Sequence, residues 1–76
     1  MVDSNLLKRI GVAVRFYRSK AGYSQEKLSE VSNIDRSFIG KVERGEVNVS
    51  LLTLSDISRG LGVTVEDIVK KAYEAE

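Results

Sequence analysis

The stretch from Gln25 to Arg44, QEKLSEVSNIDRSFIGKVER, decides the fold. Two short amphipathic segments flank its centre, and the apolar residues of each recur at helical spacing. Ser29 supplies a small side chain where two steeply crossing helices approach most closely, and Asn33 tolerates the positive φ that a tight turn needs. The side chains expected to fill the crossing are Leu28, Val31, Ile34, Ile39 and Val42. This pattern predicts a helix-turn-helix over residues 25–44.

The second helix of this motif has two different faces. At 100° per residue, its apolar side chains fall on one side, namely Phe38, Ile39 and Val42. The opposite side is basic and hydroxylated, with Arg36, Ser37, Gly40, Lys41 and Arg44. Arginine, lysine and serine suit guanine edges and phosphates in the major groove of DNA. Glycine costs about 1 kcal/mol relative to alanine inside a helix, so we expect Gly40 to allow a close approach to the groove.

Capping residues and breakers divide the rest of the chain into helices. The predicted helices cover residues 4–21, 24–31, 36–44, 51–61 and 65–73. Their N-caps are Asp3 or Ser4, then Ser24, Asp35, Ser50 and Thr64, and Gly22, Gly45 and Gly62 end three of them. No window shows the alternation of a strand. We therefore expect an all-α protein, a compact five-helix bundle that forms one domain over residues 1–76.

The first predicted helix carries apolar side chains on two sides. The larger set should face the core and consists of Leu6, Ile10, Ala13, Val14, Tyr17 and Ala21. Val12 and Phe16 lie four residues apart on the opposite side. They are expected to be exposed, either to water or to a partner protein.

Composition excludes several classes of function. The 76 residues contain no cysteine and no histidine, which removes disulfides, thiolate sites and the commonest general base and makes a metal site improbable. With no carboxylate pair in an evident cleft, we expect neither an enzyme nor a cofactor or small-molecule ligand. No apolar run approaches the ~20 residues of a membrane span, and the N-terminus lacks a secretory signal. A cytoplasmic protein without membrane contact is predicted.

Charge is unevenly distributed along the chain. Residues 1–45 hold nine Lys and Arg against five Asp and Glu, a net charge of +4, and residues 46–76 hold three against six, a net charge of −3. The first part is therefore the one expected to meet an anion such as DNA.

Further motifs give the chain a family resemblance. Ser24-Gln25 opens one helix, Glu43-Arg44-Gly45 closes the next, and Leu61-Gly62-Val63 ends the fourth. With these markers, residues 6–73 resemble the helix-turn-helix family of lambda repressor and Cro. The run from Asp35 to Gly40, followed by ERGE, is most similar to the controller proteins of restriction-modification systems. Some controller proteins have a polar residue where Gly40 stands and a basic one where Val47 stands.

The resemblance implies roles for particular residues. Gln25 would donate to a DNA phosphate, helped by the helix N-terminus. Arg36 and Ser37 would enter the major groove, and Asn48 would contact phosphate. Lys41 and Arg44 would contact bases or backbone, and a salt bridge between Arg18 and Glu43 would tie the first helix to the recognition helix.

A homodimer is expected because the last helix, residues 65–73, carries two apolar stripes. One stripe holds Val65, Ile68 and Ala72, and the other Val69 and Tyr73. One can close the core, and the other is then free for a second copy. The predicted interface comprises Leu61, Val63, Val65, Val69 and Tyr73. Two recognition helices about 34 Å apart would read a palindrome in double-stranded DNA.

The predicted function is that of a transcriptional regulator. It binds a palindromic operator as a dimer and controls restriction-modification genes together with its own promoter. Two alternatives remain open at this point. One is a protein-interaction module, such as an antitoxin or an adaptor, that docks a partner through Val12 and Phe16. The other is a solitary repressor of an unrelated operon.

Overall fold

A computed structural model describes residues 4–74, and among these residues helices are the only regular secondary structure. The helices are α1 (Ser4–Ala21), α2 (Gln25–Ser32), α3 (Arg36–Glu43), α4 (Leu51–Leu61) and α5 (Val65–Glu74). All five predicted helices are confirmed, and their ends differ from prediction by one residue at most. Asp3, one of the two predicted caps of α1, lies outside the described residues. No helix among residues 4–74 is both long and apolar enough to cross a membrane.

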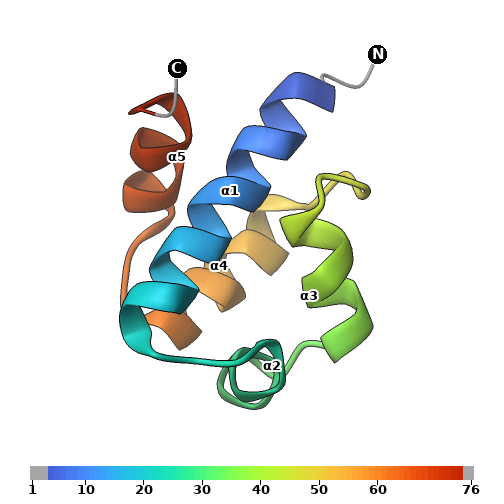
Figure 1. The fold of residues 1–76 in the computed structure, drawn as a ribbon, viewed down its shortest axis with the longest axis vertical. Coiled ribbons are helices and arrows are strands. Elements are labelled where there is room, and N and C mark those ends of the chain that lie inside the picture. Colours follow the sequence, from blue (N-terminus) through green and yellow to red (C-terminus); the bar gives the residue numbers. More distant parts are fainter. Residues whose placement is uncertain (1–3, 75–76) are drawn as a thin grey trace.

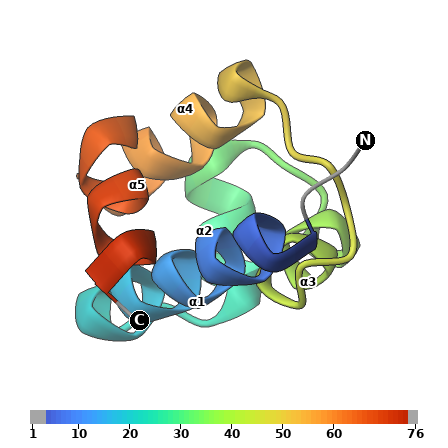
Figure 2. The ribbon, with the colours of Figure 1, turned by 90° about the horizontal axis from the view of Figure 1, so that it is seen from above.

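Helix α1 runs through the molecule and organises the others around it (Figure 1). Helix α5 packs antiparallel to α1 on one side, α3 lies on the other side, and α4 closes the back (Figures 1 and 2). One hydrophobic core joins the helices, formed by Ile10, Ala13, Val14, Leu28, Ile39, Val42, Leu54, Ile57, Leu61, Ile68 and Ala72. Because α3 and α5 flank α1 on opposite sides, the exposed face of α3 points away from α5.

The predicted caps and turn account for the lengths of the helices. The side chains of Ser24, Asp35 and Ser50 accept hydrogen bonds from backbone N–H groups in the first turns of α2, α3 and α4. Asn33 ends α2 in the left-handed conformation, with φ of 58°, as its place in the turn predicts. Ser29 has a further role that spacing did not reveal, because its hydroxyl donates to the Ile34 carbonyl and holds the turn against α2.

Two helix crossings depend on glycine. A Cβ placed on Gly11 of α1 would lie 2.5 Å from the Val42 carbonyl oxygen and even nearer to that of Glu43, so α1 rests directly on the end of α3. A Cβ on Gly60 of α4 would lie 3.1 Å from the side chains of Val31 and Ser32. These contacts fix α3 and α2 against the rest of the domain, which sets how far α3 stands out from it.

Two expected core residues are in fact exposed. Val31 was predicted to fill the crossing of α2 and α3, but it is 40% exposed and points its Cγ2 toward Gly60 of α4. Ala21 was predicted to face the core, yet it is exposed at the last residue of α1, where the chain turns away. Helical periodicity therefore gives the direction of these side chains but not how much of each one its neighbours cover.

Candidate nucleic-acid interface

The exposed face of α3 is the polar face that the helical projection predicts. Arg36, Ser37 and Lys41 are exposed, and Arg44 follows the helix as its C-cap. Behind them Ile39 and Val42 are fully or almost fully buried. Phe38 is half-buried and packs against the core. Helix α3 therefore anchors the motif with one side and presents the polar side chains of Arg36, Ser37 and Lys41 with the other.

Ser37 is partly committed to the helix N-terminus. Its backbone N–H donates to the Asp35 carboxylate at 2.9 Å, and its hydroxyl lies 3.1 Å from the same oxygen. The hydroxyl proton is thus used by the cap, while its oxygen remains exposed and can accept. Ser37 can therefore receive a hydrogen bond from a base amino group without disturbing α3.

Glu43 is the centre of a buried polar network at the end of α3. Its side chain is fully buried and accepts hydrogen bonds from Arg18 at 2.6 and 2.9 Å, which confirms the geometry of the predicted salt bridge. Gln25 donates to the same carboxylate at 3.0 Å, and Arg15 lies 3.7 Å away. Burial opposes ionisation of Glu43, but these donors and charges outweigh it and hold its pKa below the ordinary value. The network therefore links the start of α2, at Gln25, to the end of α3, at Glu43.

The network also changes the interpretation of Gln25. The resemblance implies a phosphate contact by its side chain, yet one amide proton is already bound to Glu43. Gln25 still opens α2, whose first backbone N–H groups favour an anion. The second amide proton of Gln25 and the N-terminus of α2 are thus the groups left at this position for an anion.

Gly40 and Arg44 are linked in a way that spacing did not reveal. Gly40 is buried, and a Cβ placed on it would lie 3.1 Å from Nη1 of Arg44 and 3.7 Å from Oε1 of Gln25. The gap in the side chains of α3 is therefore filled by the Arg44 guanidinium, which folds back along the helix. Arg44 also forms a two-point ion pair with Glu46, at 2.8 and 3.2 Å. The prediction that Gly40 leaves open space for the groove is wrong in this structure.

The loop after α3 carries the last predicted contact. Asn48 is exposed there, two residues before the cap of α4. Its neighbour Val47 is half-buried and packs against the core, so a basic residue at this position would have to leave that packing. Among the described residues, no group of acidic side chains could hold a metal ion.

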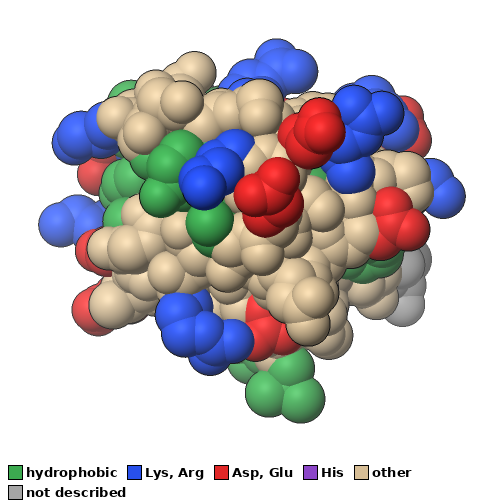
Figure 3. Space-filling model, turned by 90° about the horizontal axis from the view of Figure 1, so that it is seen from below, with side chains coloured by type: hydrophobic (Ala, Val, Ile, Leu, Met, Phe, Trp, Pro, Cys, Tyr) green, Lys and Arg blue, Asp and Glu red, His purple; other side chains and the backbone are tan. Residues whose placement is uncertain are grey.

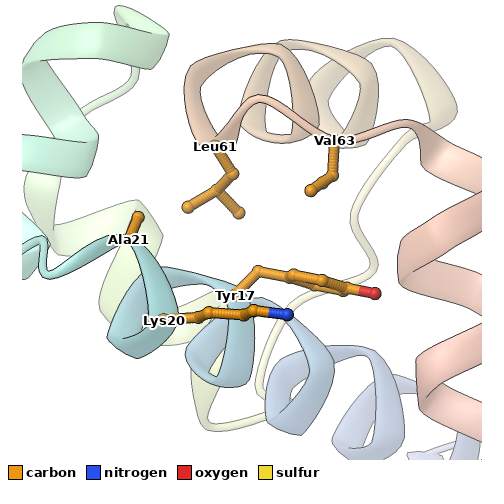
Figure 4. Close-up of a pocket in the computed structure, with 5 residues that line it drawn as sticks. All are labelled: Tyr17, Lys20, Ala21, Leu61 and Val63. Carbon is orange, nitrogen blue, oxygen red and sulfur yellow. The ribbon is translucent and has the colours of Figure 1, made fainter.

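Three residues of the predicted dimer interface take part in packing within the monomer. Leu61 belongs to the core, and Val63 and Val65 are half-buried against it. Figure 4 shows Leu61 and Val63 pointing toward Tyr17 and Lys20 of α1, where they line a shallow pocket of about 240 Å³. These three residues were predicted at the interface because the sequence alone does not show that their side chains pack within the monomer. Val69 and Tyr73 are exposed, so the stripe of Ile68 and Ala72 is the one that closes the core.

The most exposed leucines were missed by the sequence reading. Leu51 and Leu52 begin α4 and are 72% and 82% exposed. A signal was present, because residues 47–55, VNVSLLTLS, contain no charge in a chain that is 30% charged. This uncharged segment covers the end of the loop after α3 and the first half of α4.

Val12 and Phe16 are exposed, as predicted. The Phe16 ring is covered in part by Lys71 of α5, whose Nζ lies 3.9 Å from the ring centroid, and Tyr17 meets it edge-on at 5.1 Å. These contacts give Phe16 a structural role at the seam of α1 and α5.

Charges of both signs are interspersed on the face that carries α2 (Figure 3). That face therefore presents no uniform positive field.

An exposed, donor-rich helix that is locked at a fixed angle to a capped partner helix defines a helix-turn-helix protein. Comparison with known proteins agrees, since the family model described as helix-turn-helix matches residues 14–68. The control protein C.SmaI of Serratia marcescens is 41% identical over 58 residues, which span 76% of this chain and 69% of that protein. The control protein C.BamHI of Bacillus amyloliquefaciens is 40% identical over 69 residues, 90% and 85% of the two chains.

A solved structure extends the likeness to three dimensions. The restriction-modification controller protein C.Esp1396I, solved as a tetramer in complex with its natural 35 base-pair operator, superposes with a TM-score of 0.79 at 30% identity. The match covers 90% of this chain and 95% of that one. The chain therefore belongs to the helix-turn-helix family and is a relative of the restriction-modification controller proteins within it.

Proposed function

We propose that this protein is a sequence-specific transcriptional regulator that binds a palindromic operator as a homodimer. The genes controlled would be those of a restriction-modification system, together with the regulator's own promoter. The observation that supports this most directly is the exposed face of α3. Arg36, Ser37 and Lys41 stand free of the core there, while the Glu43 network fixes the helix that bears them.

The residues divide into those that position the protein and those that read sequence. Gln25 and Asn48 flank α3 on either side and contact phosphates. Arg36 and Ser37, at the N-terminal end of α3, reach base edges in the major groove, and Lys41 contacts a base or phosphate one turn further on. Arg18 takes no part in contact and holds Glu43, so its effect on binding is indirect.

The second copy docks on exposed apolar side chains, either those of α4 or those of α5. Leu51 and Leu52 form one candidate surface and Val69 and Tyr73 the other. We favour the leucines, because a two-fold contact sets a segment against its own copy and an uncharged segment avoids self-repulsion there.

The test begins by selecting duplexes from a random-sequence library with the wild-type protein. Binding of the selected duplex and of a scrambled duplex is then measured for Arg36→Ala and Gln25→Ala. Arg36→Ala should lose discrimination between the two duplexes, while Gln25→Ala should weaken both by a similar factor. Arg59→Ala is the matched control, because Arg59 is an exposed arginine on α4, away from α3. Retained discrimination in the Arg36 variant would remove its assigned role.

The proposed function also includes what the protein does not do. We propose that it acts in the cytoplasm, where its DNA target lies, and that it has no catalytic activity. The support is the family itself, whose members are DNA-binding regulators. A nuclease or methyltransferase activity of the purified protein on its selected duplex would contradict this.

A further inference from the structure

The ion pair between Arg44 and Glu46 has an orientation that matters for recognition. Glu46 Oε2 accepts from Nε of Arg44 at 2.8 Å, and Oε1 accepts from Nη2 at 3.2 Å. A guanidinium has five N–H donors, so three remain after these two are used. The three are both protons of Nη1 and one of Nη2, and one proton from each of these nitrogens forms the fork at the end of the side chain. That fork is the arrangement that matches O6 and N7 of guanine.

Gly40 makes this orientation possible. Arg44 follows Gly40 by four residues, so its side chain folds back over that position on the helix surface. Nη1 lies 3.1 Å from where a Cβ would stand on Gly40, a contact tighter than most side chains accept. Glycine thus leaves room for the guanidinium to lie flat on α3, beside Gln25.

We propose that Glu46 is a specificity-determining positioning residue, which holds the Arg44 guanidinium across Gly40 so that its free fork faces a guanine edge. This rests on the proposed function. Glu46 acts through Arg44 and touches no base itself. Without it, Arg44 is a long, half-exposed cation that can reach the nearest phosphate of any sequence.

The negative charge of Glu46 also favours specific over non-specific binding. Its side chain is 52% exposed, so the carboxylate stands in solvent at the edge of the surface that meets DNA. A negative charge there opposes phosphate contact by Arg44 and weakens binding to every sequence. A guanine in the right position restores the affinity, because it accepts hydrogen bonds from the fork while Arg44 stays paired with Glu46. The pair therefore lowers non-specific binding more than specific binding.

The experiment measures binding of the selected and the scrambled duplex by fluorescence anisotropy at several salt concentrations. Glu46→Gln should bind the scrambled duplex roughly fivefold more tightly, and its dependence of log K on log salt should steepen by about one, for one added phosphate contact. The ratio of the two affinities should fall five- to tenfold, on the order of the loss of one base contact. Glu46→Asp, which keeps the charge but shortens the reach, should lose part of the ratio, and a wild-type ratio in this variant would overturn the positioning role.

Two further variants separate this inference from simpler causes. Glu74→Gln removes an equally exposed carboxylate that pairs with Lys71 on α5, so it makes the same charge change far from α3. It should leave the ratio unchanged. Gly40→Ala should displace the guanidinium and lower the ratio, while raising the thermal midpoint because alanine favours the helix.

The outcomes are distinguishable from failure of the proposed function. If the wild-type protein selects no sequence from the library, the proposed function itself fails. If it selects a sequence and Glu46→Gln keeps the wild-type ratio, the inference about Glu46 is wrong and the function stands. It is equally wrong if Glu74→Gln lowers the ratio as much as Glu46→Gln.

Discussion

Substitution of Gly11 by alanine separates local propensity from tertiary packing. Gly11 lies in the middle of α1, where sequence alone favours alanine by about 1 kcal/mol. In the folded protein, a Cβ at this position would lie 2.5 Å from the Val42 carbonyl oxygen and 2.8 Å from the Glu43 carbonyl carbon. Ordinary contact begins at 3.4 Å, and the obstacle is backbone rather than the end of a flexible side chain.

The expected cost follows from the displacement that relieves this overlap. Helix α1 must retreat from the end of α3 by roughly 1 Å, which weakens packing along their contact and stretches the hydrogen bonds between Arg18 and Glu43. Overpacking of this kind costs about 1–3 kcal/mol and sometimes more. With the stretched buried ion pair added and the helix gain subtracted, we expect a net loss of about 2–4 kcal/mol. That is a large part of the roughly 4–11 kcal/mol expected for a chain of this length.

Thermal and denaturant unfolding, followed by circular dichroism, test the expectation. A loss of 2–4 kcal/mol corresponds to a fall in the thermal midpoint of roughly 10–30 °C for a domain of this size. Gly40→Ala is the matched control, because it is the same change in another helix interior, where the nearest neighbour is the end of the Arg44 side chain and not backbone. It should be neutral or stabilising. A Gly11→Ala protein as stable as the wild type would refute the assigned contact.

Three other predictions concern the buried network, the turn and the interface. The lowered pKa of Glu43 stabilises the fold above its ordinary value of 4.5, and this contribution is lost as pH falls through the folded pKa. Acid titration of unfolding should therefore show a shallower decline in Glu43→Gln, from a starting stability about 2–4 kcal/mol lower at pH 7. Asn33→Ala should cost about 1–2 kcal/mol at the left-handed turn and Asn33→Gly much less, as urea midpoints will show. Leu52→Glu should shift sedimentation equilibrium toward monomer; an unchanged dimer, together with dissociation of Tyr73→Glu, would assign the interface to α5 instead.

Much of the fold follows from local rules that the sequence displays directly. Caps such as Ser24 and Asp35 satisfy N–H groups within their own helix, and Asn33 adopts its turn conformation without distant help. The alternation of core and solvent faces in α3 follows from helical geometry alone. Residues whose state depends on their own helix were therefore predicted correctly, including the exposed Val12 and Phe16 and the basic face of α3.

Tertiary structure decided what depends on the distance between helices. The predicted dimer interface included Leu61, and spacing placed Val31 in a helix crossing, but Leu61 is buried in the core and Val31 is 40% exposed. Motif resemblance paired Arg18 with Glu43, yet only the folded chain adds Gln25 and Arg15 to that carboxylate. The sequence alone determined that this protein presents a capped recognition helix with donors on one face. Which donors are free, which are held by a neighbour, and why Gly11 and Gly40 are glycines were decided by contacts between helices, because a helical period fixes a side chain's direction but not what it meets.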